Sequence, residues 1–264
     1  MTNSCSTTSG VNQLGCPDPS LGICPDFRIK RHDTKPPFEV VVKDCNEPID
    51  LTNTVVEASM WATAKFKSAV AETDTYFRLA DDIGFEQSMV GDIIVIANQV
   101  RAPEQMLVTG FDEENKLIRV QREYNGTKAW PYKKGTPIRI FRFINSVGST
   151  EMTYMDIAQV DGTTEEDVLV ESKLIYEWTS QDTCLPGCYY LELKLLKMVL
   201  PNGSPSNVSS MYLTSPIVPS FVSPSASDLG CDLGLGVEWV RRFPVDKPGF
   251  LIEIVDSPTN ENLV

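Results

Sequence analysis

Short runs in which apolar and polar residues alternate recur from residue 38 to residue 255, and they constrain the fold of this 264-residue chain more than any other feature. Such runs, bounded by turn-forming residues, are typical of β-strands with one buried face. No longer period repeats, which excludes a solenoid. The sequence therefore predicts an all-β protein. The clearest runs are residues 38–44, 55–61, 117–122, 174–178, 189–198, 237–243 and 250–255.

Residues 81–145 form a group of their own within this pattern. Their strand-like runs follow one another at roughly ten-residue spacing, as in small all-β units. Asn125 and Gly126 mark a tight turn between two of the runs, because both residue types tolerate a positive φ. The pattern therefore predicts a small β-barrel module. Its strands are expected at residues 93–96, 104–111, 117–122 and 138–143.

The chain has 36 acidic and 23 basic side chains, so its formal net charge is -13 at pH 7. This charge argues against a general nucleic-acid binder, because phosphate contact needs concentrated Lys and Arg, and it disfavours attraction to anionic lipid. No stretch approaches the roughly 20 apolar residues of a membrane span. The first residues have neither a basic start nor an apolar segment, so we expect no secretory signal and folding in the cytoplasm.

One region of the chain is locally basic. Tyr124, Trp130 and Tyr132 lie among its charges, so nucleic-acid contact has to be considered. On alternating strands, however, these charges divide among outward faces, and the acidic remainder of the chain opposes phosphate. A basic region in an acidic protein is also suited to docking an acidic subunit, and we favour docking. The basic residues are Arg119, Arg122, Lys128, Lys133, Lys134, Arg139 and Arg142.

No catalytic motif is present in the sequence. The Gly-x-Ser-x-Gly pattern and the phosphate-binding loop are both absent. The single histidine, His32, lies in an irregular segment, and we expect it to be a solvated loop residue. Acidic clusters such as Asp112-Glu113-Glu114 do not show the facing arrangement of glycosidase carboxylates. We therefore expect a protein that is not an enzyme, with no catalytic residue, no cofactor and no bound metal.

The seven cysteines are odd in number and irregularly spaced. A disulfide framework is not expected for such a set in a reducing cytoplasm. A metal site at Cys16, Cys24, His32 and Cys45 is an alternative, but the paired spacing of zinc knuckles is absent, and ordinary thiols are favoured. The cysteines are Cys5, Cys16, Cys24, Cys45, Cys184, Cys188 and Cys231.

Two separated stretches contain turn and hairpin motifs. They are Pro48-Ile49-Asp50-Leu51-Thr52-Asn53, and the series Trp178, Asp182, Thr183, Pro186, Gly187, Tyr189 and Glu192. Together they resemble the N-terminal domain of the bacteriophage baseplate upper protein family. In that family Gly is usual at the position of Asn53. Because Asn also adopts the left-handed conformation, we expect the turn to be kept.

A second set of motifs lies within residues 81–145. It consists of Glu104, Met106 and Val108, then Val120, Arg122 and Tyr124-Asn125-Gly126-Thr127, and finally Gly135-Thr136. This set is similar to a small β module found in many phage structural proteins. Glu123 stands where that module usually has Gly, so a local difference in the backbone is expected there.

The two resemblances cover roughly residues 36–213 and imply a discontinuous β-sandwich with an inserted small β-barrel. Outside the match, the residue pattern predicts an extended N-terminal arm and a C-terminal β segment. The N-terminal residues are rich in Ser, Thr, Pro and Cys; an arm ordered on a neighbouring subunit and a disordered tail both remain open. The expected units are the arm (1–35), the first half of the sandwich (36–80), the inserted barrel (81–145), the second half of the sandwich (146–213) and a C-terminal loop with a β-hairpin (214–264).

The resemblances imply a non-catalytic structural or adaptor subunit in the tail, baseplate or neck of a phage particle assembled in the host cytoplasm. Its expected partners are other virion proteins and copies of itself, without a small-molecule substrate, nucleic acid or membrane. A receptor-binding fibre or a capsid decoration protein is an alternative, and a tail-associated hydrolase is a further one. No partner-binding residue can be assigned from the sequence.

Overall fold

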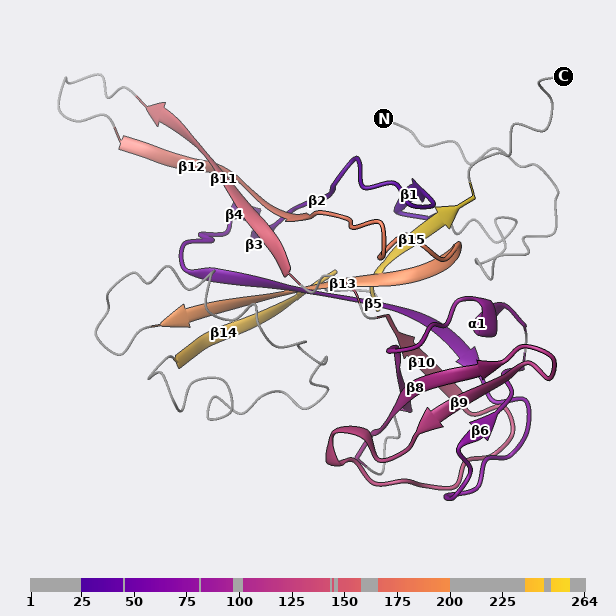
Figure 1. Cartoon of the computed structure of the whole chain (residues 1–264). Coiled ribbons are helices and arrows are strands. Elements are labelled where there is room, and N and C mark those ends of the chain that lie inside the picture. Colours follow the sequence, from indigo (N-terminus) through magenta and orange to yellow (C-terminus); the bar gives the residue numbers. More distant parts are fainter. Residues whose placement is uncertain are drawn as a thin grey trace, which may run out of the picture.

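A computed structural model describes residues 25–44, 46–80, 82–96, 102–142, 144, 147–157, 166–199, 236–244 and 248–256 (Figure 1). Most of the N-terminal arm and most of the C-terminal loop thus lie outside the described residues. The described chain is built almost entirely from strands, with one five-residue helix, α1 (Asp82–Glu86), and one 3₁₀ turn (Tyr124–Gly126). The prediction of an all-β protein is confirmed. No helix in these ranges combines the length and apolarity needed to cross a membrane.

Most of the observed strands lie close to the runs predicted from the sequence. The strands are β1 (Phe27–Lys30), β2 (Phe38–Val41), β3 (Lys43–Asp44), β4 (Glu47–Pro48), β5 (Thr54–Lys65), β6 (Tyr76–Phe77), β7 (Ile93–Ile96), β8 (Glu104–Asp112), β9 (Leu117–Gln121), β10 (Pro137–Phe141), β11 (Val147–Ile157), β12 (Glu166–Tyr176), β13 (Gly187–Val199), β14 (Gly236–Phe243) and β15 (Phe250–Val255).

A single path of paired strands runs through most of the described chain, in the order β1-β15-β13-β5-β10-β7-β8-β9-β6. Only the β1–β15 pair is parallel. The path is open, and the closed barrel expected for residues 81–145 does not form among the described residues. The physical reason lies in β10. Its two edges are occupied by β7 and β5, so it does not pair with β9 or β6, and the chain after β5 meets the segment after β6 only through an isolated bridge, Phe66 to Leu79.

The main hydrophobic core lies between the central strands β5, β13 and β15 and the pair β2 and β12. Met60, Leu191 and Ile252 from the central strands belong to the same buried cluster as Phe38 and Tyr176 from the other two. Burial of such apolar side chains is the main source of folding free energy. The division of this core into the two halves of a sandwich stays a prediction.

A second core belongs to strands β6 to β10, which we call the module. Its buried residues include Ile94, Met106, Ile118 and Ile140. The 12-residue strand β5 enters both cores, and its last residues together with the segment after it contribute Ala64, Phe66 and Val70 to the second. The boundary placed at residue 81 stays a prediction. Between the cores, the Trp61 ring contacts those of Phe141 and Tyr190, at centroid distances of 5.3 and 5.9 Å.

Both C-terminal strands pair with β13 rather than with each other: β15 pairs with residues 187–191 and β14 with residues 193–199. They therefore extend the central sheet and do not form a hairpin in the described residues. The edge beyond β15 is covered by β1, where Ile29 is buried in the main core.

The hairpin of β11 and β12 extends away from the rest of the molecule (Figure 1). At its base, Val147 and Gly148 pair with β5, and residues 173–176 of β12 pair with β2. Towards its tip the two strands pair with each other, with a register shift between Thr153 and Tyr154. The module lies at the opposite end of the molecule from this hairpin (Figure 1).

Candidate functional site

The basic region expected to act as a docking surface divides into buried and exposed residues. Arg122 and Arg142 point inward, with side chains only 6% and 0% exposed. The other five basic residues are exposed: Arg119, Lys128, Lys133, Lys134 and Arg139.

Arg122 forms a buried network with Glu104. Its Nε donates to Glu104 Oε1 at 2.5 Å and its Nη2 to Glu104 Oε2 at 2.9 Å, while Nη1 donates to the carbonyl oxygens of Ala71 and Asp74. Glu104 also accepts hydrogen bonds from the Trp130 amide (3.1 Å) and the Tyr132 hydroxyl (2.8 Å). A buried ion pair stabilises only when its remaining hydrogen-bonding groups are satisfied, as they are at this carboxylate. Two of the aromatic residues predicted near a docking surface thus help to hold the module together, Trp130 through its backbone amide and Tyr132 through its hydroxyl.

Arg142 forms a looser buried pair with Asp92, at 3.7 Å between Nε and Oδ1. Its Nη1 donates to the Tyr189 hydroxyl at 3.2 Å, which links the end of the module to β13. Burial raises the pKa of Tyr189 to about 12, and although the Arg142 charge opposes this shift, desolvation dominates. Arg142, Asp92 and Tyr189 are thus buried, and Arg142 contacts the other two.

The exposed basic residues do not form one stripe. Arg119 lies over the Tyr76 ring at the β9–β6 edge, at 5.0 Å. Arg139 lies over the Trp61 ring where β10 meets β5, at 5.5 Å. In the strand path, β9 and β10 are separated by β7 and β8. A dispersed set of cations suits contact with a protein better than the continuous tracking of a phosphate backbone.

The motif at residues 48–53 forms a turn stabilised by its own side chains. Asp50 Oδ1 accepts from the Thr52 amide at 2.9 Å, and Asn53 adopts a φ of 56°. The expected left-handed conformation of Asn53 is therefore confirmed. Lys197 holds the turn against β13 by donating to Asp50 Oδ2 (3.2 Å) and to the carbonyl oxygen of Thr52 (2.6 Å).

Three residues of the turn at residues 123–127 have a positive φ. Glu123, Asn125 and Gly126 have φ values of 57°, 56° and 71°. Glu123 thus occupies the left-handed region, which glycine enters more easily. Thr127 joins the turn to β8, because its Oγ1 accepts from the Gln105 amide at 3.1 Å and donates to the Tyr124 carbonyl at 2.9 Å.

The motif that begins at Trp178 closes around Asp182, which is 1% exposed. Asp182 Oδ2 accepts from the Tyr176 hydroxyl (3.0 Å) and from the Thr179 amide (2.7 Å). Burial, together with the Asp182 charge, raises the pKa of Tyr176 strongly, so this phenol stays protonated. The polar residues of the motif are therefore used to shape a turn.

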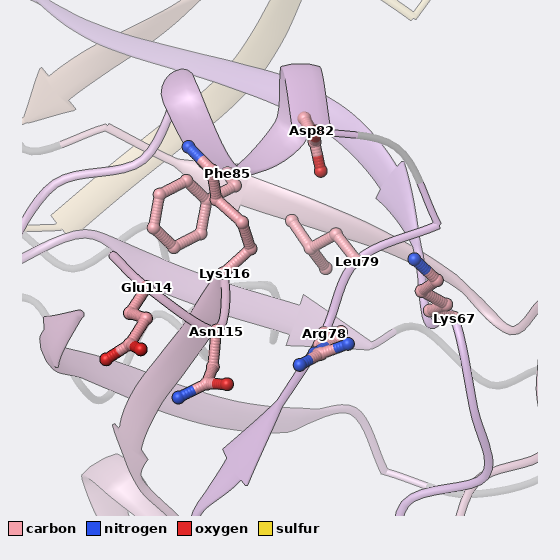
Figure 2. Close-up of a pocket in the computed structure, with 8 residues that line it drawn as sticks. All are labelled: Lys67, Arg78, Leu79, Asp82, Phe85, Glu114, Asn115 and Lys116. Atoms are coloured by element: carbon pink, nitrogen blue, oxygen red, sulfur yellow. The ribbon is translucent and has the colours of Figure 1, made fainter. Parts of the chain in front are cut away.

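One cavity, of about 160 Å³, lies on the surface of the module (Figure 2). Its apolar floor consists of Leu79 and Phe85, and the Lys116 ammonium lies 4.9 Å from the centre of the Phe85 ring. Figure 2 shows charged groups around Leu79 on several sides. Three of the lining residues are cations, Lys67, Arg78 and Lys116, and none of them forms an ion pair with a described residue. The polar lining residues are Lys67, Arg78, Asp82, Glu114, Asn115 and Lys116.

The hairpin of β11 and β12 displays large apolar side chains to solvent. Tyr154 and Met155 are 50% and 57% exposed, and Val168 and Val170 on the partner strand are 39% and 38% exposed. Because successive residues of a strand point to opposite faces, neither face is covered at this level of the hairpin. The sequence prediction contained neither this hairpin surface nor the cavity.

The single histidine and the described cysteines lie apart from these surfaces. His32 is exposed in the turn after β1 and has a φ of 63°. Cys184 is free, but Cys188 is disulfide-bonded, although no disulfide framework was expected from the sequence. Irregular cysteine spacing does not reveal such a bond, because spacing does not determine connectivity. In the described ranges, no three metal-binding side chains gather; Cys16, Cys24 and Cys45 lie outside those ranges.

No protein-family model matches the chain, and no curated protein matches it. The resemblance to phage modules therefore rests on the motif residues, and the function derived from it is a proposal.

Proposed function

We propose that the chain is a non-catalytic structural adaptor of a bacteriophage virion, in the tail, baseplate or neck, where it binds neighbouring virion proteins and copies of itself. The observation that supports this most directly is the Glu104–Arg122 pair. Glu104 and Arg122 come from two separate parts of the second motif set, and they meet in one buried network. The spacing between these motifs thus has a structural cause, as expected of a shared module.

The use of the polar residues supports the non-catalytic part of the proposal. Glu104, Asp182 and Arg142 are buried and bonded within turns or between strands. These contacts give them structural tasks. The long exposed hairpin and the dispersed exposed cations instead offer surface for protein contacts.

The direct test is to locate the chain in purified particles of the phage that encodes it. We expect mass spectrometry to find the chain in particles that have been separated from cell lysate, and cryo-microscopy to place it in a ring of the tail, baseplate or neck. A chain found only in the lysate, or a purified monomer that binds a glycan tightly or degrades a cell-wall polymer, would contradict the proposal.

A variant with a weakened module makes the test sharper. Glu104→Gln should reduce incorporation into particles while leaving soluble chain in the lysate. Glu113→Gln changes an exposed glutamate of the same module and should incorporate normally. Equal incorporation of both variants would show that the module is not needed for assembly.

A further inference from the structure

We propose that copies of this chain associate head to tail, with the β11–β12 hairpin of one copy bound in the module cavity of the next. This inference rests on the proposed function in taking the partner to be a structural subunit, and it assigns the two surfaces that meet. Tyr154 is the side chain that enters the cavity.

The hairpin has the composition of a binding element. Its exposed apolar residues Tyr154, Met155, Val168 and Val170 are four of the seven large apolar side chains exposed in the described part of the chain. Met155 and Val168 are direct cross-strand partners, so they form one continuous apolar surface. Apolar side chains concentrated on one projecting element mark an interaction surface.

The charge of the hairpin segment indicates the kind of surface that it can bind. Residues 147–176 contain seven acidic side chains and one lysine. That lysine, Lys173, already pairs with Glu171 at 3.1 Å. The segment is therefore acidic in composition and exposes apolar side chains on its described strands, so the partner surface that suits it is basic with an apolar floor.

The module cavity matches this requirement. Three cations, Lys67, Arg78 and Lys116, line it around Leu79 and Phe85 (Figure 2). Two carboxylates, Asp82 and Glu114, lie in the same lining, so the cations are in excess by one charge. Arg78 alternates with Tyr76 on the outward side of its segment, and Arg119 lies over the Tyr76 ring, which extends the basic aromatic surface. A cation beside an aromatic ring is attracted to it, so a phenol entering the cavity would meet favourable partners.

The size of the cavity favours a single side chain. Sites for free small molecules usually have volumes of about 300–1,000 Å³, whereas a cavity of about 150 Å³ accommodates one benzene ring. The volume here is about 160 Å³. This matches the ring of Tyr154 better than a metabolite.

The two surfaces lie at opposite ends of the molecule, so the hairpin of a copy does not fill its own cavity (Figure 1). Contact between two different surfaces of identical subunits is heterologous, and it produces a closed ring or an open filament. A ring is the arrangement expected of a symmetric part of a virion.

The test measures the mass of the purified full-length chain in solution by analytical ultracentrifugation. We expect the average mass to rise with protein concentration at low salt and to fall at high salt, because the contact is partly ionic. Tyr154→Ser and Arg78→Glu should each weaken association at least tenfold, whereas Val90→Ser, which alters an exposed apolar residue elsewhere, should leave it unchanged.

Mixing the two defective variants tests the head-to-tail geometry. The Tyr154→Ser chain retains an intact cavity and the Arg78→Glu chain retains an intact hairpin, so a 1:1 mixture should form dimers and nothing larger. If Tyr154→Ser fails to fold by circular dichroism, Tyr154→Thr replaces it, since Thr also removes the ring and its branched shape suits a strand.

Three outcomes overturn the inference: an unaltered chain that stays monomeric at every concentration, variants that associate as strongly as the unaltered chain, and a mixture that forms no dimer. The proposed function fails separately. A chain that associates in solution but is absent from particles contradicts the function, and a monomeric chain found in particles contradicts only the head-to-tail contact.

Discussion

The module and the central sheet each contain a fully buried carboxylate, and the two differ in the groups that bind it. Glu104 in the module is 0% exposed and accepts two hydrogen bonds from the Arg122 guanidinium. Asp182, in the turn before β13, is 1% exposed and accepts from a tyrosine hydroxyl and a backbone amide. Glu104 is thus paired with an opposite charge, whereas a hydroxyl and a backbone amide donate to Asp182.

The two regions should therefore lose stability for different reasons. Removing one member of a buried ion pair leaves an uncompensated charge, which costs more than the loss of an ordinary hydrogen bond. The module should therefore be sensitive to the loss of either charge. The central sheet should lose stability when its buried tyrosines, Tyr176 and Tyr189, lose their hydroxyl protons.

The largest effect is expected from Glu104→Gln, which keeps the shape of the side chain but leaves Arg122 without its counter-charge. We expect the free energy of unfolding to fall by about 3–5 kcal/mol, the usual cost of breaking a buried pair. Urea unfolding followed by circular dichroism measures it.

The exposed Glu113→Gln is the matched control and should change stability by less than about 0.5 kcal/mol. Combining Glu104→Gln with Arg122→Met should recover part of the loss, since the unpaired charge is then removed. If the double variant is destabilised by the sum of the two single changes, the description of the site as a coupled ion pair is wrong.

The second prediction concerns pH and separates the central sheet from the module. Burial raises the pKa of Tyr189 from 10.0 to about 12, and burial with the Asp182 charge raises that of Tyr176 as well. The folded state then holds protons that the unfolded state releases. Stability should be unaffected below about pH 10 and should fall as the pH rises towards 12.

For Tyr189 alone, this shift corresponds to a loss of about 3 kcal/mol across the window. Urea unfolding at a series of alkaline pH values measures the decline. Tyr189→Phe removes the titrating group and should flatten the decline, although it also removes the hydrogen bond to Arg142. A stability that stays constant through the window would contradict the assignment.

The sequence predicted local structure well because strand alternation is local. In β9, Ile118 and Val120 are buried and Arg119 is exposed, as the pattern indicates. The same alternation, extended by two positions from Val120, places Arg122 inward and could have predicted its burial. At the end of β10 the alternation stops, since Ile140 and Phe141 in the strand and Arg142 after it are all buried, and no local pattern predicts that.

Long-range features were less accessible to the sequence prediction. Closure of the module depends on which strand occupies the second edge of β10, and that strand, β5, is more than 70 residues earlier in the chain. The cavity likewise combines Lys67, Arg78 and Lys116, which no motif connects. Chain topology brings these residues together, and a single sequence contains little information about it.

The smallest expected effect concerns the turn at Glu123. Glu123 has a φ of 57°, and a left-handed conformation is costly for a residue with a Cβ. Glu123→Gly removes that cost, but the glycine loses more entropy on folding. The net effect should be a stabilisation of roughly 0.5 kcal/mol, the low end of such backbone substitutions.

The neighbouring Gly126 provides the opposite change. It has a φ of 71° and open space around its Cα, so Gly126→Ala introduces backbone strain without a steric clash. This variant should be destabilised by roughly 1 kcal/mol. Thermal unfolding of the two variants beside the unaltered chain shows whether each change raises or lowers the stability. If Glu123→Gly destabilises the protein instead, the weak hydrogen bond that Glu123 Oε1 accepts from the Ala129 amide, at 3.4 Å, contributes more than the backbone strain costs.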